Sequence, residues 1–130
     1  MRSNRLEYDS IRDISQKIID EHSFYALKGD FLDYFYAHKE LREELIQDEP
    51  VDRPDLPDWM LPFLAAMVHK LCNDYNLAVP SWVWHDRYYL CEPRFSHNAQ
   101  GKMKAWLLVH AAGEFKHRNL FVSADTLDRA

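Results

Sequence analysis

Residues 59–75, WMLPFLAAMVHKLCNDY, decide the fold that the sequence predicts, because their apolar side chains recur at every fourth position. Two such rows lie next to each other, which makes the apolar face of the predicted helix wide. A face of this width indicates a central helix that is buried by its neighbours. The rows are Trp59, Phe63, Met67, Leu71 and Tyr75, and beside them Met60, Leu64, Val68 and Cys72.

Both ends of this predicted helix carry their own signals. Asp58 can cap the N-terminus with its side chain. Pro62 falls in the first turn, where a missing N–H costs little. Asn76 suits the left-handed conformation that ends a helix, so we expect the helix to stop there.

Helically spaced apolar residues predict further helices on both sides. The first covers residues 5–27 and stops at Gly29; Asp30 caps the second, which starts with FLDYFYA and continues or restarts in HKELREELIQ. Later in the chain, KMKAWLLVHAAGEF predicts another helix and NLFVS a short extended segment. The side chains expected to face inward from the later helix are Met103, Trp106, Leu107 and Val109 or His110.

Residues 48–58, DEPVDRPDLPD, predict a connector without regular structure, because each of their three prolines removes a hydrogen-bond donor. The connector divides the chain into two parts, each too small to fold apart. We therefore predict a mainly α fold. It is a single compact domain over residues 1–130 with about five helices, a long aromatic-rich connecting segment and one short hairpin or extended segment. Residues 1–28 supply its N-terminal helix, and residues 29–130 the remainder.

The composition favours a globular protein that stays in the cytoplasm. Of the 130 residues, 47% are hydrophobic and 28% are charged, which argues against disorder. The formal net charge of −5 disfavours nucleic acid as a partner, because phosphates are bound by clustered Lys and Arg. We find no apolar run of the length that a membrane span needs. Cys72 and Cys91 form no disulfide framework, and we expect both to be free, buried thiols.

The seven histidines raise the hypothesis of a small metal-dependent enzyme. The best set is His110, Glu114 and His117, which share one face if residues 103–118 form a continuous helix. Gly113 weakens that helix, and the sequence indicates no fourth ligand. An acid–base pair of His85 and Asp86 and a nucleophilic cysteine are weaker signals, and no glycine-rich phosphate loop is present. We therefore expect no catalytic residue, no metal and no cofactor.

The aromatic segment, residues 82–95 (WVWHDRYYLCEPRF), allows two interpretations. Its rings can pack across helices while the charged residues between them face water or pair internally, Arg94 with Glu92 or Asp86. Alternatively, its arginines and aromatic rings form a binding surface, since these residue types are typical of protein–protein hot spots. The basic cluster FKHRN, residues 115–119, ends a helix and can extend that surface.

Four stretches in order resemble a family of poorly characterised bacterial proteins: FLDYFYAHKELREELIQDEP, LPFLAAMVHKLCNDYNLAVPSWV, DRYYLCEPRF and FKHRNLFVSADTLDRA. The resemblance covers about residues 29–130. Some members carry this domain behind a helix-turn-helix module, and some look like antitoxins encoded beside nucleotidyltransferase-type proteins. Only about 28 residues precede the FLDYFY segment here, too few for an ordinary helix-turn-helix domain. Arg94 stands where the family pattern tends to have Trp.

The resemblance and the Arg-rich aromatic segment together predict a non-catalytic protein-interaction module, antitoxin-like or regulatory. Its expected partner is a protein, such as a nucleotidyltransferase-type toxin encoded nearby. The alternatives are the metal-dependent enzyme and a DNA-associated regulator. The residues expected to bind the partner are Trp82, Trp84, Arg87, Tyr89, Glu92, Arg94, Phe95, Lys116, Arg118 and Asn119.

Overall fold

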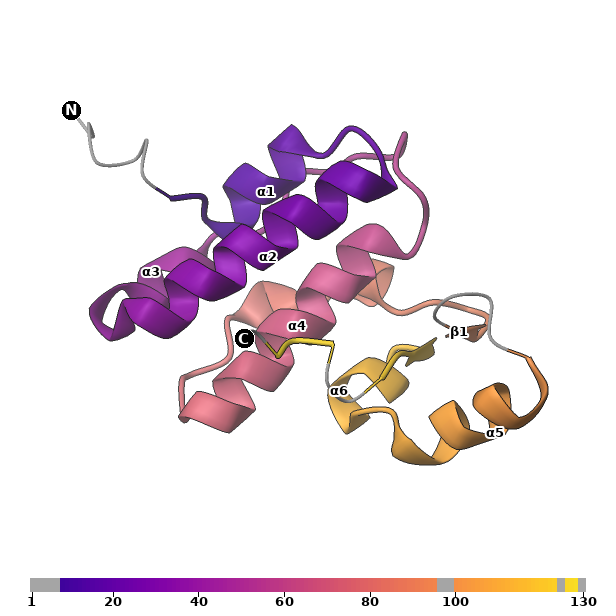
Figure 1. Cartoon of the computed structure of the whole chain (residues 1–130). Helices are drawn as coiled ribbons and strands as arrows, with labels where there is room; N and C mark the ends of the chain where they lie inside the picture. Colours follow the sequence, from indigo (N-terminus) through magenta and orange to yellow (C-terminus); the bar gives the residue numbers. More distant parts are fainter. Residues whose placement is uncertain (1–7, 96–99, 124–125, 129–130) are drawn as a thin grey trace. The chain divides into compact units, whose positions relative to one another are not determined.

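The computed structural model describes residues 8–95, 100–123 and 126–128, and this part of the chain is mainly helical (Figure 1). It divides into two compact units, one ending at Pro57 and the other spanning residues 58–128. The boundary falls at the end of the predicted proline-rich connector, in which the structure has no helix or strand. The mainly α fold class is confirmed, with six α-helices in the described residues where about five were expected.

The first unit contains α1 (Ile11–Lys17), α2 (Glu21–Ala37), the 3-10 helix η2 (Lys39–Leu41) and α3 (Arg42–Gln47). The prediction of a single helix over residues 5–27 is wrong, because the backbone adopts an extended conformation at Ile18 and ends α1 there. Asp20 then caps α2 by accepting a hydrogen bond from the Ser23 N–H, while the Ser23 side chain accepts from the Asp20 N–H. This reciprocal capping box makes a new helix start more favourable than continuation. Gly29 is no stop, and Asp30 no cap; both lie inside α2.

The connector is fixed to the end of α1 within the first unit. The Arg53 guanidinium donates to the carbonyl oxygens of Ser15 at 2.9 Å and Ile18 at 3.2 Å. The Val51 N–H donates to the Ser15 hydroxyl at 2.9 Å. These bonds satisfy carbonyls that the end of α1 leaves open, so an irregular segment still has a defined path.

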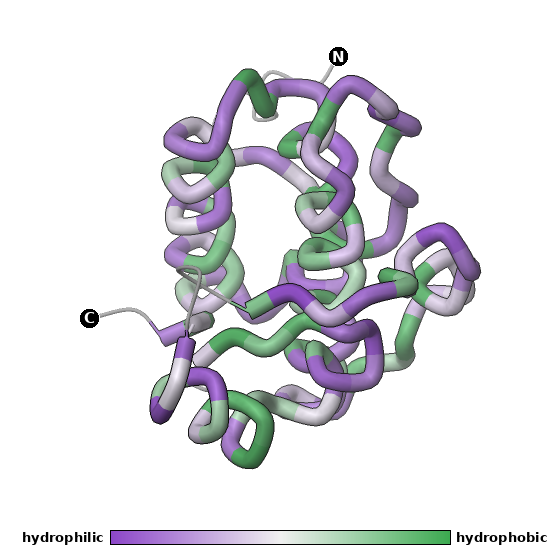
Figure 2. Tube along the Cα trace, turned by 90° about the vertical axis from the view of Figure 1, so that its right-hand side faces the viewer, coloured by the Kyte–Doolittle hydropathy of each residue, from purple (hydrophilic) through white to green (hydrophobic). Residues whose placement is uncertain are grey.

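In the second unit, the central helix α4 (Met60–Tyr75) confirms the predicted buried helix. Asn76 ends it in the left-handed conformation at φ 59°, as expected. The prediction that Asp58 caps the helix is wrong, because Trp59 occupies the N-cap position and makes no capping hydrogen bond with its side chain. Hydrophobic and hydrophilic residues are mixed along the helices in Figure 2, and the hydrophobic ones of α4 are largely buried. Its buried residues are Met60, Pro62, Phe63, Leu64, Ala65, Ala66, Met67, Val68, Leu71 and Cys72.

Short elements follow α4: the 3-10 helices η3 (Ser81–Trp84) and η4 (Asp86–Tyr88), β1 (Arg94–Phe95), α5 (Gly101–His110), α6 (Gly113–Lys116) and β2 (Leu120–Phe121). α4 packs against η3, η4 and α6. The expected short β element is a parallel pair of β1 and β2, with Arg94 opposite Leu120 and Phe95 opposite Phe121. It is therefore not a hairpin, since its strands come from distant parts of the chain.

The helix predicted for KMKAWLLVHAAGEF is divided in two, because Ala111 and Ala112 both adopt extended backbone conformations. Of its expected inward-facing side chains, Leu107 alone is buried. Leu107 packs with Ala111 and Phe121 in a small cluster, against which Phe95 lies. Within the described residues, no helix is long and apolar enough to cross a membrane.

The two cysteines differ in exposure, which corrects the expectation that both are buried: Cys72 is buried in α4, whereas Cys91 is exposed. Burial raises the pKa of the Cys72 thiol to about 11, so it remains protonated at neutral pH. Titration of the native protein with a thiol reagent at pH 8 should therefore label Cys91 rapidly and Cys72 only on unfolding. The Cys91→Ser variant should lose the fast phase, and rapid labelling of that variant would contradict this assignment.

Candidate functional site

The aromatic segment is partly core and partly surface. Trp82 and Tyr88 are buried, and their rings meet edge to face with centroids 5.6 Å apart. Trp84, which is 46% exposed, and the exposed Arg87 belong to the same two 3-10 helices. The structural and the binding interpretation therefore apply to different residues of one segment.

Arg118 joins the elements of the second unit, and its side chain is fully buried. One guanidinium nitrogen lies 3.1 Å from His69 Nδ1 on α4 and donates to the Glu114 carbonyl oxygen at 3.0 Å. The other donates to the Val83 carbonyl oxygen at 3.0 Å. Three separate elements, α4, η3 and α6, are thus held by one side chain.

Aromatic rings complete the surroundings of Arg118. The guanidinium carbon lies 4.8 Å from the centre of the Tyr89 ring and 5.6 Å from that of Trp84. Within the described part of the chain, its Nε finds no hydrogen-bond partner. Burial lowers the pKa of Arg118 below its usual value, although Tyr89 and Glu114 act in the opposite direction. The positive charge of Arg118 is thus stabilised by two carbonyl oxygens, one imidazole nitrogen and the faces of two aromatic rings.

His69 has to be neutral to accept this hydrogen bond, because a guanidinium can only donate. Burial lowers the pKa of His69, and the positive charge of Arg118 lowers it further, whereas Glu114 acts to raise it. The ring also packs edge to face on Trp84, with centroids 4.7 Å apart. His69 is therefore a neutral acceptor whose protonation would place two positive groups in contact.

Glu114 and Asn119 continue the network on either side. The Asn73 side-chain amide donates to a Glu114 carboxylate oxygen at 2.7 Å. Burial acts to raise the pKa of Glu114, but this bond, together with Lys70 and His69, brings the pKa below its usual value. Asn119, at φ 66°, donates through its side chain to the Leu90 carbonyl oxygen at 2.7 Å and accepts from the Arg94 N–H at 2.8 Å. Both residues thus tie α6 and the turn after it to their neighbours.

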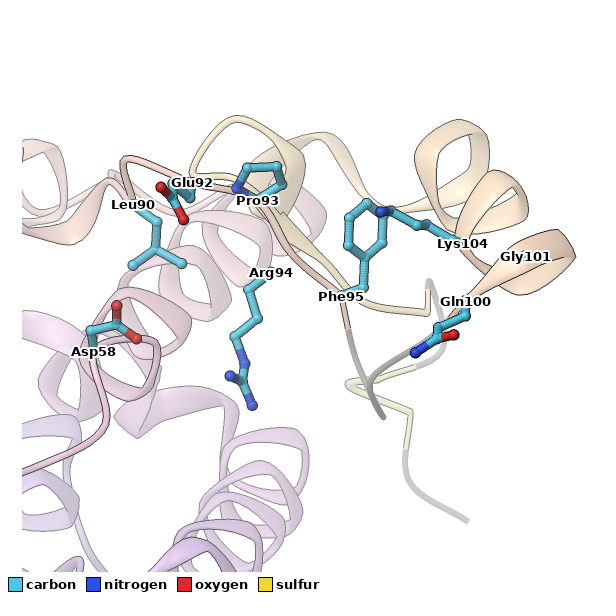
Figure 3. A pocket seen from close by; sticks show the side chains of 9 residues that line it. All are labelled: Asp58, Leu90, Glu92, Pro93, Arg94, Phe95, Gln100, Gly101 and Lys104. Atoms are coloured by element: carbon cyan, nitrogen blue, oxygen red, sulfur yellow. The ribbon is translucent and has the colours of Figure 1, made fainter.

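A surface cleft of about 680 Å³ lies beside β1 and the start of α5 (Figure 3). Asp58 and Glu92 lie at one end, and Phe95 and Lys104 lie at the other. Arg94, which we expected to pair with Glu92 or Asp86, instead extends over the ring of Trp59 at 4.7 Å. The cleft is lined by Asp58, Leu90, Glu92, Pro93, Arg94, Phe95, Gln100, Gly101 and Lys104.

The ten predicted partner-binding residues therefore fall into three groups according to how exposed their side chains are. Trp82 and Arg118 are buried, which takes their side chains away from the surface. Tyr89, Phe95, Lys116 and Asn119 are half-buried, and Trp84, Arg87, Glu92 and Arg94 are exposed. The structure gathers Glu92, Arg94 and Phe95 at the cleft, and it places Tyr89 and Trp84 against Arg118.

The proposed metal set does not form on one helix. The chain breaks between α5, which carries His110, and α6, which carries Glu114. Glu114 is bonded to Asn73, and the His110 ring lies against Trp106 with centroids 4.6 Å apart. Across the described ranges, no group of three His, Cys, Asp or Glu residues could hold a metal ion.

Two features were missed by sequence reasoning. The partnership of His69 with Arg118 joins residues 49 positions apart, and no local pattern indicates it. The exposure of Met103, Trp106, Leu108 and Val109 on α5 was also missed. No local pattern indicated it, since consecutive apolar residues such as Trp106 to Val109 are more typical of a buried helix.

Comparison of the chain with protein-family models, curated proteins and solved structures finds no match in any of the three.

Removing the Arg118 guanidinium should be among the most destabilising single changes in the chain. In Arg118→Met, the acceptors on His69, Val83 and Glu114 lose their donor, and buried polar groups without partners cost about 1–3 kcal/mol each. We expect the free energy of unfolding to fall by about 3 kcal/mol or more in urea denaturation. Arg87→Met removes an exposed arginine whose guanidinium carbon lies 5.3 Å from the centre of the Tyr88 ring, and it should lower the free energy of unfolding by no more than about 1 kcal/mol. Equal effects of the two changes would contradict the structural role of Arg118.

The His69 contact should make stability depend on pH. Because the pKa of His69 is lower in the folded than in the unfolded chain, the unfolded state binds the proton more readily. The contribution of His69 is complete above the pKa of an unfolded histidine, about 6.5, and is lost as the pH falls below it.

This pH dependence can be isolated with His69→Asn, whose amide oxygen can still accept from Arg118 but cannot titrate. The variant should lose less stability than the wild type between pH 7.5 and pH 5 in urea denaturation. His22→Asn, which changes an exposed histidine on α2, should keep the wild-type dependence. An NMR titration that places the pKa of His69 above 6.5 would refute the contact.

Proposed function

We propose that the chain is a non-catalytic protein-interaction module with an antitoxin-like or regulatory role. The observation that carries the proposal is the exposure of apolar side chains on α5, where Met103 is 56% and Val109 69% exposed. Trp106, at 44%, lies between them on the same helix. Groups of exposed apolar side chains rimmed by polar residues are typical of protein-interaction sites.

The arrangement of the second unit supports a division of roles. Arg118 and Asn119 are engaged by His69, Val83 and Leu90, so they hold the unit together. The polar groups most suited to chemistry, His69 and Glu114, are bonded within this same network. Exposed arginine and aromatic side chains remain at the cleft and on α5, and these residue types dominate protein–protein hot spots.

The partner that we propose is a protein encoded nearby, of the nucleotidyltransferase type. This part of the proposal follows from the resemblance of the FLDYFY, EPRF and FKHRN stretches to the bacterial family whose antitoxin-like members are encoded beside nucleotidyltransferase-type proteins. The site would include α5 and the neighbouring cleft, with Glu92, Arg94 and Phe95 as its predicted members. Trp84 and Arg87 are further exposed candidates on η3 and η4.

The proposal predicts a complex with the product of the adjacent gene. Co-expression should allow the two proteins to be purified together and should suppress the activity or toxicity of the partner. Trp106→Ala should weaken the complex at least about tenfold in calorimetry, since a buried interface Trp contributes strongly to affinity.

The matched control is Ile19→Ala, which removes an apolar side chain that is 84% exposed in the first unit. It should leave the affinity unchanged within about twofold, whereas circular dichroism should show both variants folded. Absence of a complex, together with unchanged activity and toxicity on co-expression, would end the proposal.

A further inference from the structure

We propose that α5 binds an amphipathic helix of a partner protein whose apolar side chains are flanked by carboxylates. This inference rests on the proposed function and specifies the chemistry of the partner at that site. The binding surface, called the α5 face below, consists of Lys102, Met103, Trp106, Val109 and His110, all of them exposed.

Helical spacing brings these five side chains together. Lys102, Trp106 and Val109 follow the i, i+4, i+7 pattern, and Met103, Trp106 and His110 follow i, i+3, i+7. Trp106 therefore lies at the centre, with its ring tilted by 30° against that of His110. Leu107, the buried residue of α5, lies beside this face and is covered by Ala111 and Phe121, so the side chain that anchors α5 is not part of the binding surface.

The helix is held firmly enough to present the face. Leu107 packs with Phe121, the Lys104 ammonium lies 5.0 Å from the centre of the Phe95 ring, and the rings of Phe95 and Phe121 stack at 4.8 Å. At the C-terminal end of α5, the Lys116 ammonium donates to the Val109 carbonyl oxygen at 3.2 Å. Such a contact provides a donor for a carbonyl that the helix end leaves without one. It also places a positive charge at the negative end of the helix dipole, which is favourable. A partner therefore meets a preformed surface, which lowers the entropy cost of binding.

The charges around α5 select an acidic partner. The chain as a whole carries −5, yet α5 itself has Lys102 and Lys104 and no acidic residue. Lys116 adds a positive group at its end. The acidic residues nearest to α5, Glu114 on α6 and Asp58 and Glu92 at the cleft, lie outside the α5 face. Carboxylates beside an apolar stripe would complement this local charge, whereas a basic helix would be repelled.

The same charges favour a single helix over a large polyanion. A nucleic acid or an anionic membrane surface extends well beyond α5 and would meet the overall charge of −5. A partner helix of similar length, about 15 Å for ten residues, can lie along α5 and its two lysines without covering the rest of the chain. Helices of this size pack side by side through ridges and grooves of apolar side chains.

The test uses the full chain and two synthetic helical peptides with the same Leu and Ile stripe. One carries Glu at the flanking positions and the other carries Lys. We expect the Glu peptide to bind at least about tenfold more tightly in calorimetry, with an affinity that falls as salt is raised. Lys102→Glu should remove most of this preference, and Lys39→Glu, an exposed charge reversal on η2, should not. Trp106→Ala should weaken binding of the Glu peptide at least about tenfold.

Equal affinity for the two peptides, or binding of neither, overturns the inference. So does stronger Trp106-dependent binding to phosphatidylglycerol vesicles or to a single-stranded oligonucleotide, or self-association that Trp106→Ala abolishes. The proposed function is tested separately by the adjacent gene product. If that protein binds with an affinity independent of salt and of Lys102, the proposed function stands and only the acidic-helix partner fails.

Discussion

The buried guanidinium of Arg118 is the interaction on which the second unit depends. A buried charge costs several kcal/mol unless it is hydrogen-bonded, so elements that supply its acceptors are coupled to one another. Those acceptors come from α4, η3 and α6, and the next residue, Asn119, binds Leu90 and the start of β1. Residues far apart in the chain are thus held by polar bonds in addition to the buried apolar side chains of the same elements, such as Val83 and Phe115.

The acceptors of Arg118 also explain why this arginine of the motif FKHRN is unsuited to contact a partner. Two carbonyls and one imidazole nitrogen occupy directions that a partner's carboxylate would need, and the rings of Trp84 and Tyr89 lie against the guanidinium. A carboxylate could reach it only by displacing these groups. Within the segment 82–95, Trp84 and Tyr89 therefore act first as neighbours of Arg118.

Local patterns account for the elements that were predicted well. The paired apolar rows of α4 and the left-handed Asn76 depend on neighbouring residues, and both could be read from the sequence. The break before α2 was not predicted, because the apolar stripe continues across it and the Asp20–Ser23 capping box competes with that stripe. The candidate site was harder, since the burial of Arg118 depends on His69 and Val83, which lie 49 and 35 positions away. Exposed and buried arginines look alike in a sequence, so Arg118 could not be told apart from Arg87.

The exposure on α5 follows from how the helix is anchored. Its break at Ala111 turns the chain into α6, where Phe115 meets Phe63 of α4 with ring centroids 4.9 Å apart. α5 itself is left with Leu107 as its one buried side chain among ten described residues, and four further large apolar residues, Met103, Trp106, Leu108 and Val109, are exposed to water. Keeping Met103, Trp106 and Val109 exposed brings no hydrophobic stabilisation to the folded chain. A stable fold does not require them there, whereas a partner helix would gain by covering them, and this asymmetry supports the proposal that α5 binds a partner.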